Sequence, residues 1–393
     1  MNVPCRGSTK QRSICSRHVF DVNKASVRPK MLQYCFPRLL MRSLRNRYNV
    51  LATQRACDFS SAANSSIERL TNRSLVRVSG KDAVEYLQGL ITNDIRHLSE
   101  DHAPTKDSRQ SSKAMYCMFL DARGRVILDS IVYRVVTADG CDKNNGVYFV
   151  ECDSEMSSTL VKHLKLYKLR KKVDISPVSD EMEVWVEFNP NTVKAEKKKS
   201  YFLEECPKQS VFAVRDPRLN ALGVRVLCSK GELNDIVSNL KRLESGHYRF
   251  HRYRLGVGEG ILDIPPGNSF PLEANCDYLH GVSFHKGCYV GQELTARTHH
   301  TGVVRKRLMP LYLSSSVSQV SETSIVDPST GKSVGKFRGV VNLGDDGAGL
   351  GLLRVAEALR IPLMKAGDSE LKTEKPFWWP EEAPKELKAK GGA

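Results

Sequence analysis

The stretch from Phe284 to Gly302, FHKGCYVGQELTARTHHTG, constrains this chain more than any other part of its sequence. It combines a lysine, a cysteine, a tyrosine, a Gln-Glu pair and three histidines with glycines at 287, 291 and 302. Neither helical nor strand periodicity explains this mixture. Glycine permits left-handed backbone conformations and close approach of other groups. We therefore expect an irregular segment that carries chemistry.

Cys288 is the candidate reactive group of this stretch. It follows Gly287 and lies two residues after Lys286. In an extended segment, side chains two residues apart point to the same side, and an ammonium beside a thiol favours the thiolate. We therefore hypothesise a reactive or metal-touching thiolate. The alternative is a buried structural cysteine in a tight turn, because free cysteine is often an inert small hydrophobe.

The positive charge of the chain is concentrated at its start. The formal net charge is +16, but residues 1–57 hold twelve Lys and Arg and one acid, Asp21, so they carry +11 of it. An arginine-rich, acid-poor leader is typical of a mitochondrial transit peptide, and a basic tail that binds an acidic partner is the alternative. Since the rest carries only +5, we expect no nucleic-acid partner. No apolar run approaches the ~18 residues that span a bilayer, so we also expect no membrane segment.

The eleven cysteines are scattered singly, and four of them lie in the leader. An odd count without a Cys-x-x-Cys pair fits neither a disulfide framework nor a zinc finger. The pattern suits a reducing compartment.

The folded part reads as short strands mixed with helices. Residues 121–124 predict a hairpin turn between two strands. Alternating and helical apolar spacings predict the other elements. We expect strands at 75–78, 116–120, 125–136, 147–152, 184–188, 211–214, 223–227 and 303–313, helices from Asp82, at 154–169 and at 232–243, and short glycine-punctuated strands at 323–356. This order indicates an α+β fold with a small β-barrel or sandwich near the C-terminus.

The segment KGCYVGQE, residues 286–293, resembles the signature of the YgfZ-type folate-binding proteins. The mitochondrial members of that family assist iron–sulfur cluster assembly, and they are relatives of the glycine cleavage T-protein, an aminomethyltransferase. The similarity extends over roughly residues 65–358. It includes residues 87–89, 92–94, 119–125, 253–254, 259–260 and 271–275.

The resemblance implies a cloverleaf of α+β subdomains around a central cavity, closed by a C-terminal β-barrel. It implies a folate-binding region at 65–302 and a barrel at 303–360. The composition of the remaining segments indicates a transit peptide at 1–57 and a polar tail at 361–393, with Phe377-Trp378-Trp379 able to dock on the body. The resemblance also implies a mitochondrial matrix location.

The resemblance also implies a set of site residues. The motif supplies Lys286, Cys288, Gln292 and Glu293 as catalytic candidates. A folate site needs apolar walls, a polar reader for the pterin and cations for the glutamate tail. The candidates for that site are Asn93, Asp129, Glu273, Tyr289, Arg123, Arg125 and Arg254.

The chain departs from T-protein at Leu128-Asp129, where T-protein carries two adjacent acids. Three functions follow as alternatives. The first is a factor for [4Fe–4S] protein maturation that uses tetrahydrofolate and Cys288. It would work with A-type iron–sulfur carriers and [4Fe–4S] client proteins, and Cys288 would ligate iron only transiently. The second is a tetrahydrofolate-dependent one-carbon transferase with Asp129 as its acid, and the third is a non-catalytic binding module.

Overall fold

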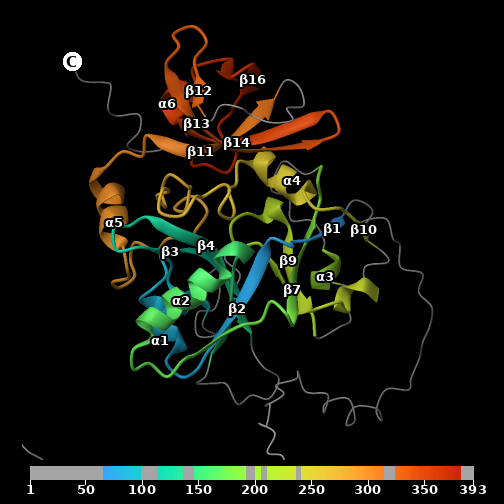
Figure 1. Cartoon of the computed structure of the whole chain (residues 1–393), viewed down its shortest axis with the longest axis vertical. Helices are drawn as coiled ribbons and strands as arrows, with labels where there is room; N and C mark the ends of the chain where they lie inside the picture. The colour runs from blue at the N-terminus through green and yellow to red at the C-terminus, as the bar shows by residue number, and fades with distance from the viewer. Residues whose placement is uncertain are drawn as a thin grey trace, which may run out of the picture. The chain divides into compact units, whose positions relative to one another are not determined.

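The computed structural model describes residues 65–98, 113–135, 146–191, 200–204, 210–235, 240–313 and 324–381. The expected transit peptide at 1–57 lies outside the described residues. The described strands form two five-stranded sheets and a closed six-stranded barrel, with short helices between them (Figure 1). None of the described helices is long and apolar enough to cross a membrane.

The first sheet has the antiparallel strand order β3-β4-β5-β2-β6. Its strands are β2 (Arg73–Ser79), β3 (Ala114–Leu120), β4 (Val126–Val135), β5 (Val147–Asp153) and β6 (Asp174–Pro177). The four strands expected here are confirmed, with ends shifted by one or two residues. The β3–β4 turn is held by Asp121, whose Oδ1 accepts hydrogen bonds from the backbone N–H groups of Arg123 and Arg125, at 2.9 Å each.

Helices α1 (Ala83–Gln88) and α2 (Ser157–Lys168) pack against one face of this sheet. Phe119 of β3 lies on that face, whereas Tyr116, three residues earlier on the same strand, belongs to the core on the opposite face. Successive strand residues point to opposite faces, so a strand covered on both faces is apolar throughout. This explains why every residue of β3 is buried.

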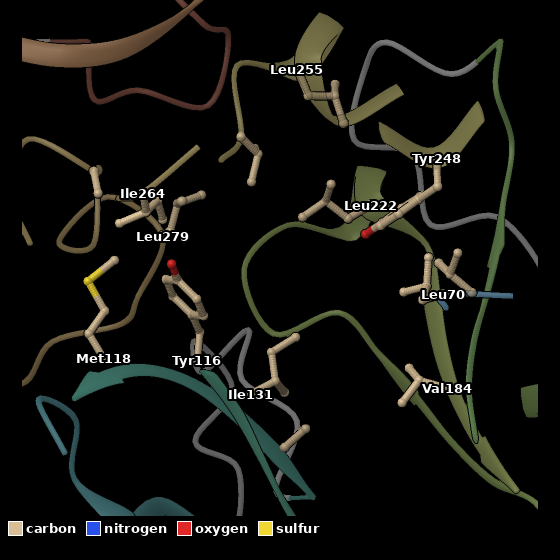
Figure 2. Close-up of a cluster of buried hydrophobic side chains, with 14 of the residues drawn as sticks. Leu70, Tyr116, Met118, Ile131, Val184, Leu222, Tyr248, Leu255, Ile264 and Leu279 are labelled. Carbon is tan, nitrogen blue, oxygen red and sulfur yellow. The ribbon is translucent and has the colours of Figure 1, made fainter. Parts of the chain in front are cut away.

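The second sheet has the order β10-β1-β7-β9-β8, in which only the β1–β10 pair is parallel. Its strands are β1 (Ser66–Arg69), β7 (Met182–Phe188), β8 (Phe212–Arg215), β9 (Val224–Ser229) and β10 (Lys241–Arg242). The two sheets share one apolar core with helix α4 (His247–Leu255) (Figure 2). Figure 2 shows Tyr116, Met118 and Ile131 of the first sheet in the same cluster as Val184 of the second.

The barrel has the order β11-β14-β13-β12-β15-β16 and closes where β16 pairs with β11. Its strands are β11 (Lys306–Leu313), β12 (Ser324–Val326), β13 (Ser333–Leu343), β14 (Asp346–Arg354), β15 (Met364–Ala366) and β16 (Ser369–Lys372), with α6 (Val355–Ala358) after β14. The expected barrel boundary at 360 is therefore wrong, because two of the closing strands follow it. The segment after β16 is also docked, since Trp379 is buried and Trp378 Nε1 donates to Leu255 O at 2.7 Å.

One expected helix, at 232–243, is wrong. The structure has a 3₁₀ turn at Glu232–Asp235 and the short strand β10, while residues 236–239 lie outside the described part. Strand β10 pairs with β1, and the Arg242 guanidinium lies 4.8 Å from the centre of the Trp185 ring. Tertiary pairing at a sheet edge has overridden the local helical pattern.

Two further helices are α3 (Tyr201–Glu204) and α5 (Gln292–Thr301). Helix α5 occupies the second half of the chemically rich stretch, which was expected to be irregular. Its periodicity is hard to read from the sequence because Thr295 is its one fully buried side chain among those described. The first half, at 284–291, contains bends and no regular element.

Candidate functional site

The loop at 281–291 is anchored to the turn that follows α1. Lys286 Nζ donates hydrogen bonds to the backbone oxygens of Gln88 (2.6 Å), Ile91 (2.7 Å) and Asn93 (2.8 Å). An ammonium has three N–H donors, so all of them are used here. Carbonyls at a helix C-terminus lack partners within the helix and favour a cation. Lys286 thus joins two sequence segments that lie about two hundred residues apart.

Side chains of the turn strengthen this junction. The Thr92 hydroxyl donates to Gly281 O at 2.6 Å. Asn93 Nδ2 donates to Tyr116 O at 2.8 Å and to His280 O at 2.7 Å, and its Oδ1 accepts from the next backbone N–H. Asn93 is therefore a buried structural amide with its donors committed, and the structure does not support its expected role as a folate reader.

The other end of the loop is held by close backbone packing. Gly291 has φ of +77°, and a Cβ there would lie 2.3 Å from Asp121 O in the β3–β4 turn. Only glycine tolerates both the conformation and the contact. The neighbouring Val290 N–H donates to Gly89 O at 3.0 Å. The loop is consequently fixed on both sides of Cys288.

Cys288 is exposed at the surface of this anchored loop. Among the described residues it is the only exposed cysteine. The other four are buried, and burial raises the pKa of each of their thiols: Cys117, Cys152, Cys228 and Cys276. The alternative of a buried structural cysteine is therefore wrong for Cys288.

The expected pairing of Lys286 with Cys288 is not observed. The segment is not extended, and the ammonium is directed at three carbonyls and at the Tyr289 ring, whose centre lies 4.8 Å away. Lys286 therefore positions the loop that carries the thiol. The reactivity of Cys288 itself stays a prediction.

Burial lowers the pKa of Lys286 from its ordinary value of 10.5 to about 8. Between these two values the unfolded chain holds a proton on this amine that the folded chain has released. Stability rises with pH wherever the unfolded state binds more protons. The contribution of Lys286 to the free energy of unfolding should therefore increase from about pH 8 towards pH 10.5.

Replacing Lys286 with methionine tests this linkage. We expect the wild-type chain to gain up to about 1 kcal/mol per pH unit relative to Lys286→Met above pH 8. Urea unfolding at several pH values measures the difference. Parallel pH dependences of wild type and Lys286→Met would contradict this assignment.

The remaining motif residues shape the start of α5. Gln292 Oε1 accepts a hydrogen bond from the backbone N–H of Tyr289 at 3.2 Å. Glu293 is exposed in the first turn of the helix, where a carboxylate complements the helix dipole. Tyr289 packs partly buried against the core. Catalytic roles for Gln292 and Glu293, and a folate contact for Tyr289, stay predictions.

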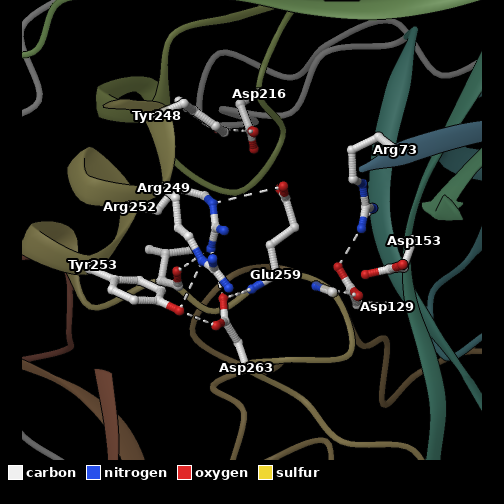
Figure 3. A network of polar contacts seen from close by, with 12 residues as sticks. Arg73, Asp129, Asp153, Asp216, Tyr248, Arg249, Arg252, Tyr253, Glu259 and Asp263 are labelled. Carbon is white, nitrogen blue, oxygen red and sulfur yellow. Dashed lines mark hydrogen bonds and ion pairs between the residues drawn. The ribbon is translucent and has the colours of Figure 1, made fainter. Parts of the chain in front are cut away.

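Asp129 lies in a buried network of charged side chains between the two sheets and the turns after α4 (Figure 3). Its Oδ1 accepts from Gly260 N at 2.9 Å, and its Oδ2 lies 3.6 Å from Arg73 Nη2. Arg73 Nε donates to Glu151 Oε1 at 2.7 Å. Figure 3 shows Glu259 between the Arg73–Asp129 pair and Arg252.

The network balances four guanidinium groups against five carboxyl groups. The arginines are Arg73, Arg218, Arg225 and Arg252, and the acids are Asp129, Glu151, Asp216, Glu259 and Asp263. Burial raises the pKa of Asp129, whereas the surrounding arginines hold the pKa of Glu259 well below its ordinary value against the effect of burial. Asp129 therefore takes up a proton more readily than Glu259 does.

Several buried polar atoms around Asp129 have no hydrogen-bond partner in the described part of the chain. They are Asp129 Oδ2, Tyr116 Oη, both Nη atoms of Arg73 and Arg218 Nη1. The Arg218 guanidinium lies 5.4 Å from the centre of the Tyr116 ring. Buried polar groups are normally satisfied, so these atoms are available to a polar ligand. A carboxyl group, a phenol and guanidinium groups beside apolar walls fit the polar edge of a pterin.

The other expected folate residues do not join this cluster. Arg123 is exposed at the β3–β4 turn, and Arg125 Nη1 donates to Gly267 O while its guanidinium lies 5.1 Å from the Phe270 ring centre. Arg254 is half-buried at the end of α4. Glu273 lines a separate small cavity beside the barrel, and burial raises its pKa. Asp129 is therefore the only residue of the expected folate set that lies in this cluster.

Apart from Asp129, the arginines and acids of this network were not predicted from the sequence. Arg225 and Glu151 lie within strands whose neighbours are apolar, and both are fully buried. Charged residues are almost never fully buried unless they are paired. A charge inside an apolar strand was the available signal, but its partners come from other segments.

No group of three or more metal-ligating side chains occurs within the described residues. Cys288 is therefore a single thiol without preformed co-ligands in that part of the chain. The nearby His299 ring instead stacks on Phe284, with centres 3.5 Å apart.

Comparison with known sequences gives three findings. The family described as "CAF17, C-terminal beta-barrel domain" matches residues 305–381, which confirms the barrel and its extension past 360. The chain is 40% identical to the mitochondrial iron–sulfur cluster assembly factor IBA57 of Mus musculus over 329 residues, covering 79% of this chain and 85% of that protein. It is 37% identical to the Homo sapiens protein of the same name over 319 residues, with the same coverage.

A solved structure is similar over most of its length. It is the aminomethyltransferase T of the glycine cleavage system from Bartonella henselae, with a TM-score of 0.57 and 13% identity, covering 81% of this chain and 87% of that one. At this identity the likeness concerns the fold alone. It confirms the expected α+β architecture with a C-terminal barrel.

Proposed function

Because this chain belongs to the family of mitochondrial iron–sulfur cluster assembly factors that includes IBA57, we propose that it supports the maturation of [4Fe–4S] proteins through Cys288. The chain is mitochondrial, as its relatives are. We propose the matrix as its compartment and residues 1–57 as its transit peptide.

The observation that carries this proposal is the exposure of Cys288 on a loop fixed at both sides. Lys286 holds one side through three hydrogen bonds, and Val290 and Gly291 hold the other. A thiol on a fixed surface loop meets a partner without a cost for ordering the loop. Thiolates are soft ligands that suit iron and iron–sulfur clusters.

One cysteine does not hold a cluster alone, and the described residues offer no further ligand group beside it. The cluster is therefore cargo, and a partner must supply the other ligands. We propose A-type iron–sulfur carriers and [4Fe–4S] client proteins as these partners, with Cys288 ligating iron transiently.

Depletion of the protein tests the proposed function. In mitochondria from depleted cells, activities of [4Fe–4S] enzymes of the aconitase type should fall while activities of [2Fe–2S] enzymes stay near normal. Re-expression of the wild-type chain should restore them. Unchanged [4Fe–4S] activities after depletion, or an equal loss of both classes, would contradict the proposal.

We also propose that a reduced folate binds beside Asp129. The support is the cluster of buried polar atoms without partners and the apolar walls around Tyr116. Asp129 and Tyr116 would meet the polar edge of the pterin, and Arg218 or Arg73 would supply donors. Turnover of methylene-tetrahydrofolate with an amine by the purified chain would favour the transferase alternative, with Asp129 as its acid.

The variant Tyr116→Phe tests the folate site. Tyr116 Oη is buried without a described partner, so its removal should leave the melting temperature unchanged or raised. Binding of tetrahydrofolate should weaken about tenfold, as expected for one lost hydrogen bond. Isothermal titration measures the affinity. Tyr312→Phe, which removes a hydrogen bond to Glu374 on the barrel, should leave it unchanged. Equal affinity of Tyr116→Phe and wild type would remove Tyr116 from the folate site.

A further inference from the structure

A groove of about 750 Å³ lies between α1 and the end of α2, which are neighbours in Figure 1. Its walls include Tyr86, Leu90, Tyr167, Leu169 and Val290. Its volume is in the range of sites that bind ligands or side chains.

The groove is continuous with the anchored loop. Val290, two residues after Cys288, is one of its walls, and the Val290 N–H is bonded to Gly89 O on the opposite side. A molecule seated in the groove therefore contacts a residue two positions away from the exposed thiol.

Large apolar side chains are exposed on the two segments that form the groove, and Leu169 is the one of them that lines it. Leu169 is 87% exposed, and Leu166, one turn earlier on α2, is 70% exposed. Val84 on α1 is 39% exposed. Neighbouring exposed apolar residues of this size mark interaction sites more often than they occur by chance.

Leu169 also has an unfavourable backbone conformation, with φ of 44° and ψ of −117°. Glycine is the usual residue where a helix ends with positive φ. Strained residues persist where the structure over-determines them, and they cluster at functional sites. A leucine here keeps an apolar side chain at the mouth of the groove at a cost to the fold.

The end of α2 and the residues after it form one side of the groove and are positively charged. Arg170 and Lys171 line the groove together with the acids Asp82 and Glu85, and Lys165, Lys168 and Lys172 lie on the same segment outside the lining. Lys171 is paired with Glu85 at 2.7 Å, and the side chains of Lys165, Arg170 and Lys172 are exposed. The excess of cations favours an acidic occupant.

We propose that this groove binds an acidic segment of a partner protein through an apolar anchor residue, and thereby places the partner beside Cys288. This inference rests on the proposed function, since the partner would be a carrier or client of the cluster. The concave shape favours a protein segment. A membrane surface would instead meet Leu166 and Leu169 as convex projections.

Photo-cross-linking of the full-length chain tests the proposal directly. The probe is an acidic synthetic peptide rich in Asp and Glu around two leucines, with a benzophenone amino acid between them. Cross-links mapped by mass spectrometry should fall within residues 82–90 and 167–171. A charge-reversed peptide with Lys in place of the acids should not cross-link there.

Two variants sharpen the test. Leu169→Gly relieves the backbone strain, so its melting temperature should equal or exceed that of wild type, while peptide affinity should fall about tenfold. Arg170→Glu should weaken binding as well. The matched controls are Leu262→Ser, at a leucine 59% exposed elsewhere, and Lys336→Glu, at an exposed lysine of the barrel; both should bind as wild type.

Three outcomes would overturn the inference: cross-links found only outside the groove, unchanged affinity in Leu169→Gly, or sedimentation with anionic vesicles that requires Leu166 and Leu169. The last would identify a membrane-binding surface. Failure of the proposed function is separate, because it is read as unchanged [4Fe–4S] enzyme activities after depletion and does not depend on the peptide.

Discussion

Replacing Glu259 with glutamine is expected to lower the free energy of unfolding by about 3–5 kcal/mol, the usual effect of breaking a buried ion pair. Glu259 Oε2 accepts a hydrogen bond from Arg218 Nη2 at 2.7 Å and another from Arg225 Nη2. Arg252 Nε lies 3.7 Å from Oε1. The variant leaves these buried guanidinium groups without their shared anion. Such a loss is a large part of the ~5–15 kcal/mol that stabilises a typical protein.

Urea unfolding of Glu259→Gln measures this effect, and Glu85→Gln is the matched control. Glu85 is paired with Lys171 at 2.7 Å, but its side chain is 75% exposed. An exposed ion pair contributes about 0–1 kcal/mol, so the control should unfold almost as wild type does. Equal effects of the two substitutions would show that the network is not what joins the two sheets.

The difference in free energy of unfolding between wild type and Glu259→Gln should also depend on pH, in a direction that the pKa of Glu259 determines. The arginines hold the pKa of Glu259 well below its ordinary value of 4.5. The stabilisation by this carboxylate is therefore fully present above about pH 4.5 and is lost as the pH falls towards the folded-state pKa. The difference between wild type and Glu259→Gln should be constant at neutral pH and shrink only in acid.

Local signals predicted four of the five strands of the first sheet and the helix at 154–169, but not β6. The turn at Asp121 to Gly124 has an acidic side chain for two backbone N–H groups and a glycine for positive φ, so both of its requirements are written in adjacent residues. The prediction of a helix at 232–243 was wrong because the structure of this segment depends on β1 and Trp185, which lie far away in the sequence.

The functional site, too, was predicted from the sequence only in part. The composition of residues 286–293 was enough to identify the loop and Cys288. The role of Lys286 was misread, because its partners are carbonyls at 88, 91 and 93, and sequence spacing says nothing about them. The buried network could not be assembled from sequence, since a charge inside an apolar strand, such as Arg225 or Glu151, does not identify its partners on other segments. Leu169 gave no signal, because its exposure and its backbone strain are properties of the folded chain.

The second prediction with a large expected effect concerns Cys288→Ala, which should abolish function without changing stability. Cys288 is exposed, so Cys288→Ala should change the free energy of unfolding by less than about 0.5 kcal/mol. The same change removes the thiol that we propose as a transient iron ligand, and [4Fe–4S] maturation should be lost. Cys288→Ser keeps the size but not the soft ligand, so it should fail equally.

The control for this loss is His285→Ala, an exposed residue of the same loop. It should restore [4Fe–4S] activities as well as the wild-type chain does. Circular dichroism melts of the three purified variants separate a folding defect from a loss of chemistry.

The most direct measurement of the central claim is aconitase-type activity in mitochondria depleted of the protein and supplied with either wild-type chain or Cys288→Ala at equal abundance. We expect recovery with wild type and activity at the depleted level with Cys288→Ala, while [2Fe–2S] enzyme activities stay the same in both. Full recovery with Cys288→Ala would contradict the account, because the anchored loop would then present a thiol that the maturation reaction does not need.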